Sequence, residues 1–219
     1  PDRVALYGYA HVPWMARRQQ MIPSDTLPRP EERLALFEAA RQLFVWDGYD
    51  EIGIDHFARP TDGAAIAAKN GTLRRNFQGY TDDPSPVLIG LGASSISRFP
   101  QGYAQMNAAT SAWTKAVREG SFAIHRGHEF RGEDLLRARL IEALMSDFRV
   151  SRAELERDFG LSRAQFEALC APIAAHFGAF VVLDANGLSI PPAGRPLTRM
   201  IAARFDAYAM AKSGHSSAI

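Results

Sequence analysis

The chain contains little cysteine, no long apolar run and almost no net charge. With one cysteine among 219 residues, it cannot form an internal disulfide framework, which fits a reducing, cytoplasmic location. No apolar run approaches the roughly 20 residues that a membrane-spanning helix needs, so we expect no membrane partner. A formal net charge of +1 gives no general reason to expect nucleic acid. The hydrophobic fraction of 47% then indicates a globular protein with one core or two modest ones.

The single cysteine, Cys170, lies within a predicted helix late in the chain. A free cysteine among apolar residues typically behaves as a small buried hydrophobe, and this is the role that we expect for Cys170. An iron–sulfur cluster requires several cysteine thiolates. The sequence therefore predicts that this chain supplies no metal ligands.

Strands and helices alternate in the first half of the sequence, an order that is typical of an α/β fold. Short apolar runs predict the strands, and apolar residues at helical spacing predict the helices. Asp62 is placed to cap a short helix that ends before Gly71. We expect strands at 3–9, 50–55 and 87–92, and helices at 30–47, 63–70 and 104–119.

The second half is predicted to be mostly helical. A polar connector occupies 120–132, so we predict one domain at 1–120 and a second at 121–219. Ser151 and Glu154 have the spacing of a capping box at a helix start. Asn186 and Gly187 are typical of the turn of a β-hairpin. We expect helices at 133–145, 151–159, 162–176 and 196–211, and a hairpin at 180–190.

Three helices followed by a hairpin form a winged-helix pattern, which by itself suggests DNA binding. A recognition helix presents basic and amide side chains to phosphates and base edges. The candidate helix at 162–176 offers Arg163, Gln165 and His176 among mostly apolar residues. Its composition favours packing, so we expect no nucleic-acid partner.

Four motifs carry polar and glycine residues to the predicted strand ends, where an α/β barrel places its chemistry. They are YAH at 9–11, GIDHFARP at 53–60, RNFQGYT at 75–81 and GLGASSIS at 90–97. In this order and spacing they resemble the oxygen-independent coproporphyrinogen III oxidases, a family of radical S-adenosylmethionine enzymes of haem synthesis. The resemblance runs from about Leu6 to about Met210, but it matches only the second half of such an enzyme.

The resemblance implies a fold and an activity. The implied fold is the C-terminal part of a radical-SAM partial (β/α) barrel at 1–120, followed by a mostly helical, winged-helix-like cap at 121–219. The implied oxidoreductase converts two propionates of coproporphyrinogen III to vinyl groups, giving protoporphyrinogen IX. Its cofactors are S-adenosylmethionine and a [4Fe–4S] cluster held by a CxxxCxxC loop, which we expect ahead of Pro1. The whole enzyme is expected to be a cytoplasmic monomer that receives electrons from a donor such as a flavodoxin.

The resemblance also assigns site residues. Ala10 is one wall of the S-adenosylmethionine site, Ile96 contacts the adenine, and Gln78 lies near the cofactor pocket. A substrate with four propionates needs planar, permanently charged donors, and Arg59 and Arg75 are the candidates, although the sequence does not decide between them. No catalytic residue is assigned.

His56 and Asp55 come at a predicted strand end, where residues that touch a ligand are expected. His56 suits a proton shuttle because its ordinary pKa lies near neutrality. It suits equally well a hydrogen bond that holds the loop at 57–60, and the sequence leaves both roles open. For Asp55 we favour a structural role, in which it caps the chain or pairs with Arg59.

A haem-binding relative of the same superfamily, which acts as a haem chaperone, is the nearer alternative function. Such relatives usually carry a different sequence in place of the Phe-Gln-Gly-Tyr segment. Here that segment is intact at 77–80, which favours the oxidase.

Overall fold

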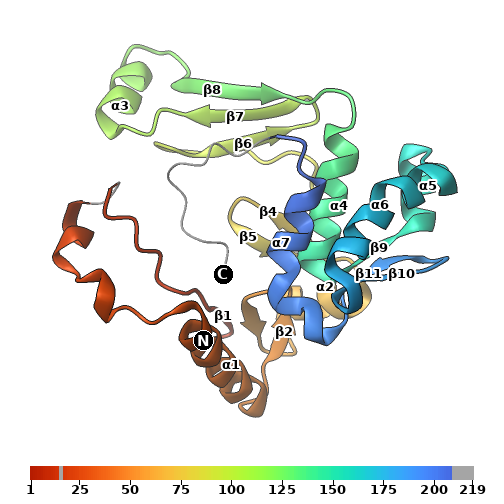
Figure 1. Ribbon diagram of the computed structural model, residues 1–219. Helices are drawn as coiled ribbons and strands as arrows, with labels where there is room; N and C mark the ends of the chain where they lie inside the picture. The colour runs from red at the N-terminus through yellow and green to blue at the C-terminus, as the bar shows by residue number, and fades with distance from the viewer. Residues whose placement is uncertain (15–16, 209–219) are drawn as a thin grey trace. The chain divides into compact units, whose positions relative to one another are not determined.

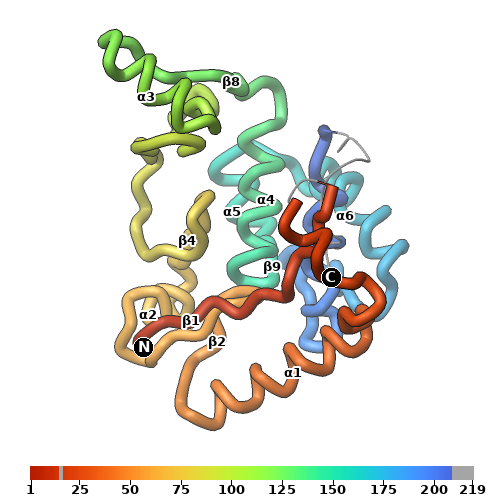
Figure 2. The backbone as a smooth tube through the Cα atoms, turned by 90° about the vertical axis from the view of Figure 1, so that its left-hand side faces the viewer, coloured from red at the N-terminus to blue at the C-terminus, as the bar shows by residue number. Residues whose placement is uncertain are grey.

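The computed structural model describes residues 1–14 and 17–208, and it divides the chain into two compact units. The first unit holds Pro1–Arg75, Tyr80–Asp82 and the described residues from Leu136 onward, and the second holds Asn76–Gly79 and Asp83–Leu135. Each unit is described by itself below. The elements are labelled in Figure 1, and Figure 2 traces the backbone from a second direction.

The N-terminal part of the first unit is built on a three-stranded antiparallel sheet with the order β1-β3-β2. All three residues of the central strand are buried. Phe57 of that strand faces Val4 on one side and Glu51 on the other, and its ring stacks on Phe44 with centroids 4.9 Å apart. The elements are β1 Arg3–Ala5, the 3-10 helices η1 Arg17–Met21 and η2 Ser24–Thr26, α1 Pro30–Trp46, β2 Asp50–Ile52, β3 His56–Ala58 and α2 Gly63–Asn70.

Helix α2 begins and ends where the sequence predicts. The carboxylate of Asp62 accepts a hydrogen bond of 2.8 Å from the backbone N–H of Ala64. Gly71 ends the helix with φ of 68°, a left-handed conformation that glycine adopts without a steric cost. The small alanine side chains of α2 pack closely against Ile52, Leu73 and Tyr80 in one buried cluster.

The C-terminal part of the first unit is helical around a second three-stranded antiparallel sheet with the order β10-β11-β9. Leu140, Leu155, Phe166 and Ile201, from four different helices, meet in its core. The elements are α4 Asp134–Asp147, whose first two residues belong to the second unit, β9 Arg149–Ser151, α5 Arg152–Phe159, α6 Arg163–Phe177, η3 Gly178–Phe180, β10 Val182–Leu183, β11 Gly187–Ser189, η4 Pro192–Leu197, α7 Thr198–Ala202 and η5 Ala203–Phe205.

Predictions for this helical part are largely confirmed. Helices α4, α5 and α6 and the hairpin β10–β11 lie where the periodicity and the Asn-Gly turn place them. Ser151 accepts the Glu154 N–H as expected, but the Glu154 side chain bonds Arg139 instead of closing the capping box. The predicted helix at 196–211 is wrong in extent. It is a short α7 flanked by η4 and η5, because prolines restrict its first part, and residues 209–211 lie outside the described residues.

The second unit contains a three-stranded antiparallel sheet with the order β6-β7-β8. Its elements are β6 Ile96–Phe99, β7 Gly102–Met106, α3 Thr110–Arg118 and β8 Ile124–Glu129. Strands β4 Arg74–Asn76 and β5 Gly79–Thr81 pair with each other, and each contributes residues to both units.

Several predictions for the second unit are wrong. The apolar run at 87–92 makes only an isolated bridge between Leu88 and Arg98, and its Leu91 is 87% exposed. The start of the expected helix at 104–119 lies in β7, and the expected connector contains β8. In β7 and β8, pairing with a neighbouring strand outweighed the local sequence preference for a helix or a loop. Because β8 pairs with β7, the chain on both sides of residue 120 belongs to one unit, and the compact units divide the chain elsewhere.

The predicted mixture of α and β structure is confirmed, since helices and sheets occur in both units. The predicted strand at 3–9 is only Arg3–Ala5, and the predicted strand at 50–55 ends at Ile52. His56 was expected at the tip of that strand, but it is the first residue of the next and central strand, β3. Within the described range, each pair whose register is defined is antiparallel.

We expect Asp62→Ala to lower the free energy of unfolding by about 1 kcal/mol at neutral pH, the usual effect of losing an N-cap. Burial raises the pKa of Asp62, but hydrogen bonds from Arg3 and Ala64 outweigh it and lower the pKa below 3.8. The stabilisation is therefore present above the ordinary pKa and is lost as the pH falls through the lowered value. Denaturant unfolding at several pH values measures this, with Asp62→Asn, which keeps an acceptor, as the milder control. Equal stability of wild type and Asp62→Ala at neutral pH would contradict the assignment.

Candidate functional site

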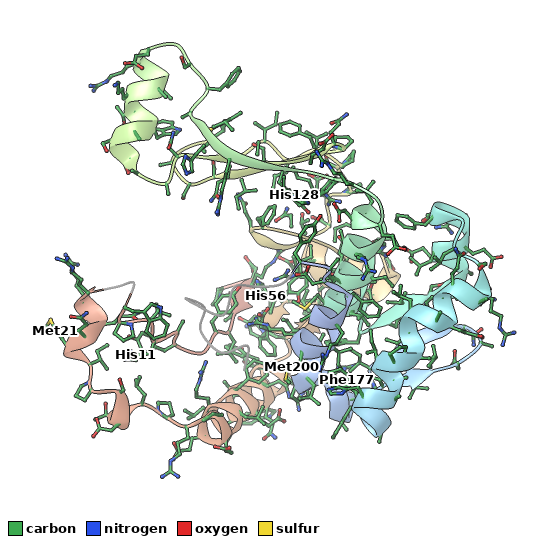
Figure 3. The ribbon with its side chains drawn as sticks, turned by 45° about the horizontal axis from the view of Figure 1, so that its top comes forward. His11, Met21, His56, His128, Phe177 and Met200 are labelled. Atoms are coloured by element: carbon green, nitrogen blue, oxygen red, sulfur yellow. The ribbon has the colours of Figure 1, made fainter. Side chains whose placement is uncertain are left out.

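A buried histidine–carboxylate pair lies in the first unit. His56 and Asp55 are 9% and 7% exposed, and Nδ1 of His56 lies 2.6 Å from Oδ1 of Asp55. Arg199 of helix α7 donates to Oδ2 of the same carboxylate at 2.6 Å, across 144 positions of sequence. Figure 3 shows the position of His56 and of Met200, the residue next to Arg199. One carboxylate thus joins the sheet of β1–β3 to the last described helix.

Two tyrosines pack on the imidazole of His56. The rings of Tyr7 and Tyr80 meet it edge-on, with centroids 5.9 and 4.9 Å away. The hydroxyl of Tyr80 accepts from the N–H of Ile54 at 3.0 Å and donates to the carbonyl of Met145 at 2.8 Å. Burial raises the pKa of Tyr80 to about 12, so its phenol stays protonated near neutral pH. Its role in this cluster is to pack and to brace the backbone.

Arg75 lies beside the cluster formed by Asp55, His56, Tyr80 and Arg199, and one of its side-chain donors has no acceptor. Its Nε is buried and has no hydrogen-bond partner, although buried polar atoms are almost always paired. Its guanidinium carbon lies 5.6 Å from the centre of the Tyr80 ring. Its backbone N–H donates to Glu142 at 3.0 Å, which holds β4 against helix α4.

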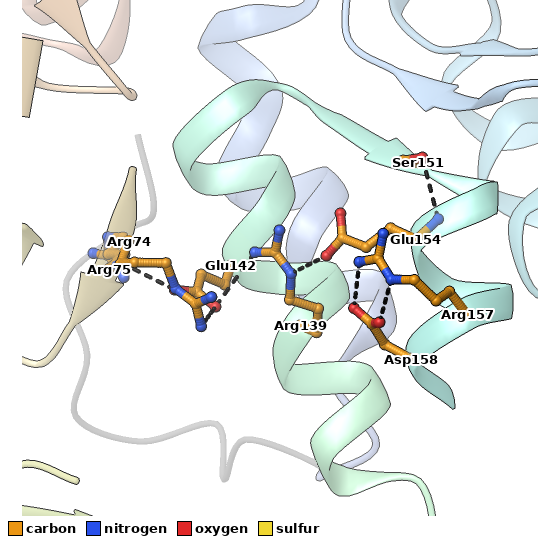
Figure 4. A network of polar contacts seen from close by, with 8 residues as sticks. All are labelled: Arg74, Arg75, Arg139, Glu142, Ser151, Glu154, Arg157 and Asp158. Carbon is orange, nitrogen blue, oxygen red and sulfur yellow. Dashed lines mark hydrogen bonds and ion pairs between the residues drawn. The ribbon is translucent and has the colours of Figure 1, made fainter. Parts of the chain in front are cut away.

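The neighbouring arginine is fully engaged, as Figure 4 shows. Arg74 makes two hydrogen bonds to the carboxylate of Glu142, at 2.9 and 3.1 Å. Arg139 lies between Glu142 at 3.4 Å and Glu154 at 2.6 Å. Burial lowers the pKa of Arg139, but the bond to Glu154 and the nearby carboxylates outweigh it and raise the pKa overall. These charges neutralise one another, so this network ties helices and strands together and leaves no charge for a ligand.

Arg59 is also engaged, with partners different from those that the sequence suggests. It donates to the carbonyl of Asp47 at 2.6 Å and to the carboxylate of the same residue at 3.2 Å. Its guanidinium lies 3.9 Å from the centre of the Tyr49 ring. The expected pairing of Asp55 with Arg59 is therefore wrong: Asp55 binds His56 and Arg199.

The three expected cofactor residues are divided between the units. Ala10 is exposed in the first unit, and its carbonyl accepts from the side chain of Gln19 at 3.1 Å. Gln78 and Ile96 belong to the second unit. Gln78 is exposed and its backbone N–H donates to Asn76 at 2.8 Å. Ile96 is half-buried and opens strand β6.

Packing explains Gly90, the first glycine of the GLGASSIS motif at 90–97. A Cβ at Gly90 would lie 2.8 Å from the carbonyl oxygen of Ile96, closer than real Cβ contacts allow. The N–H of Gly90 donates to the hydroxyl of Ser97 at 3.0 Å. The approach of the chain to strand β6 therefore requires glycine at this position without any ligand.

The chain does not fit an iron–sulfur cluster. Cys170 is fully buried in α6, and burial raises the pKa of its thiol to about 12, whereas cluster ligands are thiolates. Within residues 1–14 and 17–208, no group of three His, Cys, Asp or Glu side chains could hold a metal ion. In the same residues, no helix has the length and apolar character needed to span a bilayer.

Comparison with known proteins identifies relatives along the whole chain. It is 64% identical to an oxygen-independent coproporphyrinogen III oxidase of Paracoccus denitrificans, over 100% of this chain and 49% of the relative. A Cereibacter sphaeroides protein of the same name is 52% identical, over 95% of this chain and 46% of the relative. No protein-family model matches the chain.

A solved structure agrees with these relatives. Coproporphyrinogen III oxidase (HemN) from Escherichia coli, described as a radical SAM enzyme, matches with a TM-score of 0.88 and 34% identity. The chain is a homologue of the oxygen-independent coproporphyrinogen III oxidases. The match covers 95% of this chain and 49% of the solved one, so this homologue spans about half the length of the relatives that it matches.

Sequence reasoning missed one member of the cluster in this homologue. Arg199 follows a threonine at the start of a short helix, and nothing near it in the sequence points to Asp55. The pairing joins residues that are far apart along the chain, which local patterns do not report.

We expect the thiol of Cys170 to be unreactive toward a disulfide reagent in the folded protein at neutral pH. Its raised pKa leaves almost no thiolate, and burial excludes the reagent. Thiol titration with and without guanidinium chloride measures this. Reaction of one thiol per chain should occur only in the denaturant, and rapid reaction of the folded protein would contradict the buried assignment.

Proposed function

We propose that this chain is the C-terminal half of an oxygen-independent coproporphyrinogen III oxidase. The complete oxidoreductase would convert coproporphyrinogen III to protoporphyrinogen IX by oxidative decarboxylation of two propionates. The observation that carries the proposal is 64% identity to such an oxidase along the whole chain, together with the fold match to a radical SAM enzyme.

The complete enzyme would use S-adenosylmethionine and a [4Fe–4S] cluster, with the cluster ligands outside this chain. Support for this division comes from Cys170, whose buried thiol cannot ligate. Ala10, Gln78 and Ile96 are proposed to contact S-adenosylmethionine. The side chain of Ala10 is small and exposed, while half-buried Ile96 offers an apolar surface.

Substrate carboxylates are proposed to bind arginine. Of the two candidates, Arg75 is better supported, because its Nε lacks a partner. Arg59 already binds Asp47 and covers the Tyr49 ring, so binding substrate would require it to give up these contacts. We therefore assign Arg75 the larger part.

The finer architecture is proposed on the same basis. We infer a partial radical-SAM barrel in the first part of the chain, completed by the other half of the enzyme. The order α4-β9-α5-α6-β10-β11 and the sheet β10-β11-β9 support a winged-helix-like cap. We propose a cytoplasmic monomer that takes electrons from a donor such as a flavodoxin and binds no nucleic acid.

Helix α1 supports the idea that more protein covers this chain. None of its residues is buried, and Leu36, Leu43 and Trp46 are 62%, 61% and 86% exposed. Large apolar side chains gathered on one exposed element typically mark an interface. We propose that the other half of the enzyme covers α1.

Reconstitution with iron and sulfide tests the proposed division of the enzyme. The 219-residue chain alone should bind no cluster and form no vinyl product, because it supplies one buried thiol. The protein from the complete reading frame, with a CxxxCxxC loop, should show cluster absorbance and produce protoporphyrinogen IX under anoxia. Cluster binding by the chain alone would overturn the division, and a complete protein without that activity would overturn the function.

Replacing Ala10 by leucine tests the cofactor assignment in the complete enzyme. A bulky side chain at the proposed adenosine wall should raise the KM for S-adenosylmethionine at least about tenfold, equivalent to roughly 1.4 kcal/mol of lost binding. Steady-state kinetics at saturating porphyrinogen provide the measurement. Ala153→Leu, at an exposed alanine of α5, is the matched control and should leave the KM unchanged. An unchanged KM in Ala10→Leu would remove Ala10 from the site.

A further inference from the structure

The imidazole of His56 has one ring nitrogen engaged and one without a hydrogen bond. Nδ1 bonds Asp55, and among the described residues no hydrogen bond reaches Nε2, although the side chain is only 10% exposed. Because the carboxylate accepts from Nδ1–H, a neutral ring carries its lone pair on Nε2, and a protonated ring donates there. Nε2 is not among the buried atoms that lack a partner, so it reaches solvent and is open to a ligand.

The surroundings hold His56 more firmly than a packing role requires. Asp55 is itself buried and is bound from its other side by Arg199. Tyr7 and Tyr80 fix the plane of the ring by edge-on contacts. These contacts fix the orientation of the imidazole and hold its Nε2 in one direction.

Arg75 adds a second nitrogen without a hydrogen-bond partner, beside the same Tyr80 ring. The Nε of Arg75 is buried without an acceptor, and its guanidinium lies over the Tyr80 ring that contacts His56. Arg199 offsets the negative charge of Asp55, so the positive charge of Arg75 is not cancelled there. Two unused nitrogen sites and an excess of positive charge suit a carboxylate.

We propose that protonated His56, donating from Nε2–H, and the guanidinium of Arg75 bind one propionate carboxylate of the tetrapyrrole, with Asp55 and Arg199 as positioning residues. The inference rests on the proposed function and deepens it, because it names which groups hold the substrate. The Asp55 carboxylate keeps Nε2 directed away from itself, and Arg199 keeps that carboxylate in place.

Binding of a charged and an uncharged porphyrin to the complete enzyme tests this subsite. The probes are coproporphyrin III, which carries four carboxylates, and its tetra-amide, which has nearly the same shape and no charge. Fluorescence titration gives the Kd of each, and their ratio measures recognition of carboxylate. We expect His56→Gln and Arg75→Gln each to reduce this ratio at least tenfold, and Asp55→Asn or Arg199→Gln to reduce it less.

The control is Arg163→Gln, which removes an exposed charge that pairs with Glu167 on α6, and it should leave the ratio unchanged. Equal weakening of both probes in His56→Gln and Arg75→Gln would show a structural role and overturn the subsite. A wild-type enzyme that binds acid and amide equally would overturn the subsite but leave the function standing. Failure of the wild type to bind either probe would overturn both. Arg75→Gln leaves the hydrogen bond of His56 to Asp55 in place. If His56→Gln does not fold, the Kd ratio of Arg75→Gln tests the subsite by itself.

Discussion

The cluster around His56 depends on the two hydrogen bonds that the carboxylate of Asp55 accepts. It is buried and it binds both His56 and Arg199. A buried carboxylate without partners is costly, and removing one partner of such a pair destabilises far more than an exposed ion pair does. The two bonds therefore join strand β3 to helix α7 and at the same time orient an imidazole.

The arginines of this region differ in whether their guanidinium donors are already paired with carboxylates. Arg74 and Arg139 share the carboxylates of Glu142 and Glu154, and their charges are satisfied within the fold. Arg75, next in sequence to Arg74, has a buried Nε with no acceptor. Residue type alone does not separate a structural arginine from one that can bind a ligand, because the separation depends on which carboxylates are already occupied.

Local patterns predict the elements whose ends carry their own signals. Asp62 and Gly71 bound α2, and Ser151 caps the start of α5 by accepting from the Glu154 N–H. These helices follow from hydrogen bonds within a few residues. The sheet β6-β7-β8 does not follow, because its strands are defined by partners across turns and a helix, and its β8 is exposed at every position. An exposed polar strand carries no apolar alternation for sequence reasoning to find.

The sequence by itself determined a resemblance to the oxygen-independent coproporphyrinogen III oxidases, through four motifs in order, and its single cysteine determined that this chain cannot supply the thiolates of a cluster. It also singled out His56, whose role it left open, and Asp55, for which it favoured a structural role. Only the tertiary structure decided that Asp55 pairs with Arg199 instead of Arg59, and that Arg75 keeps an unused donor. The physical reason is that the pairing of a charge depends on which groups share its buried surroundings, and folding brings those groups together from 144 positions away.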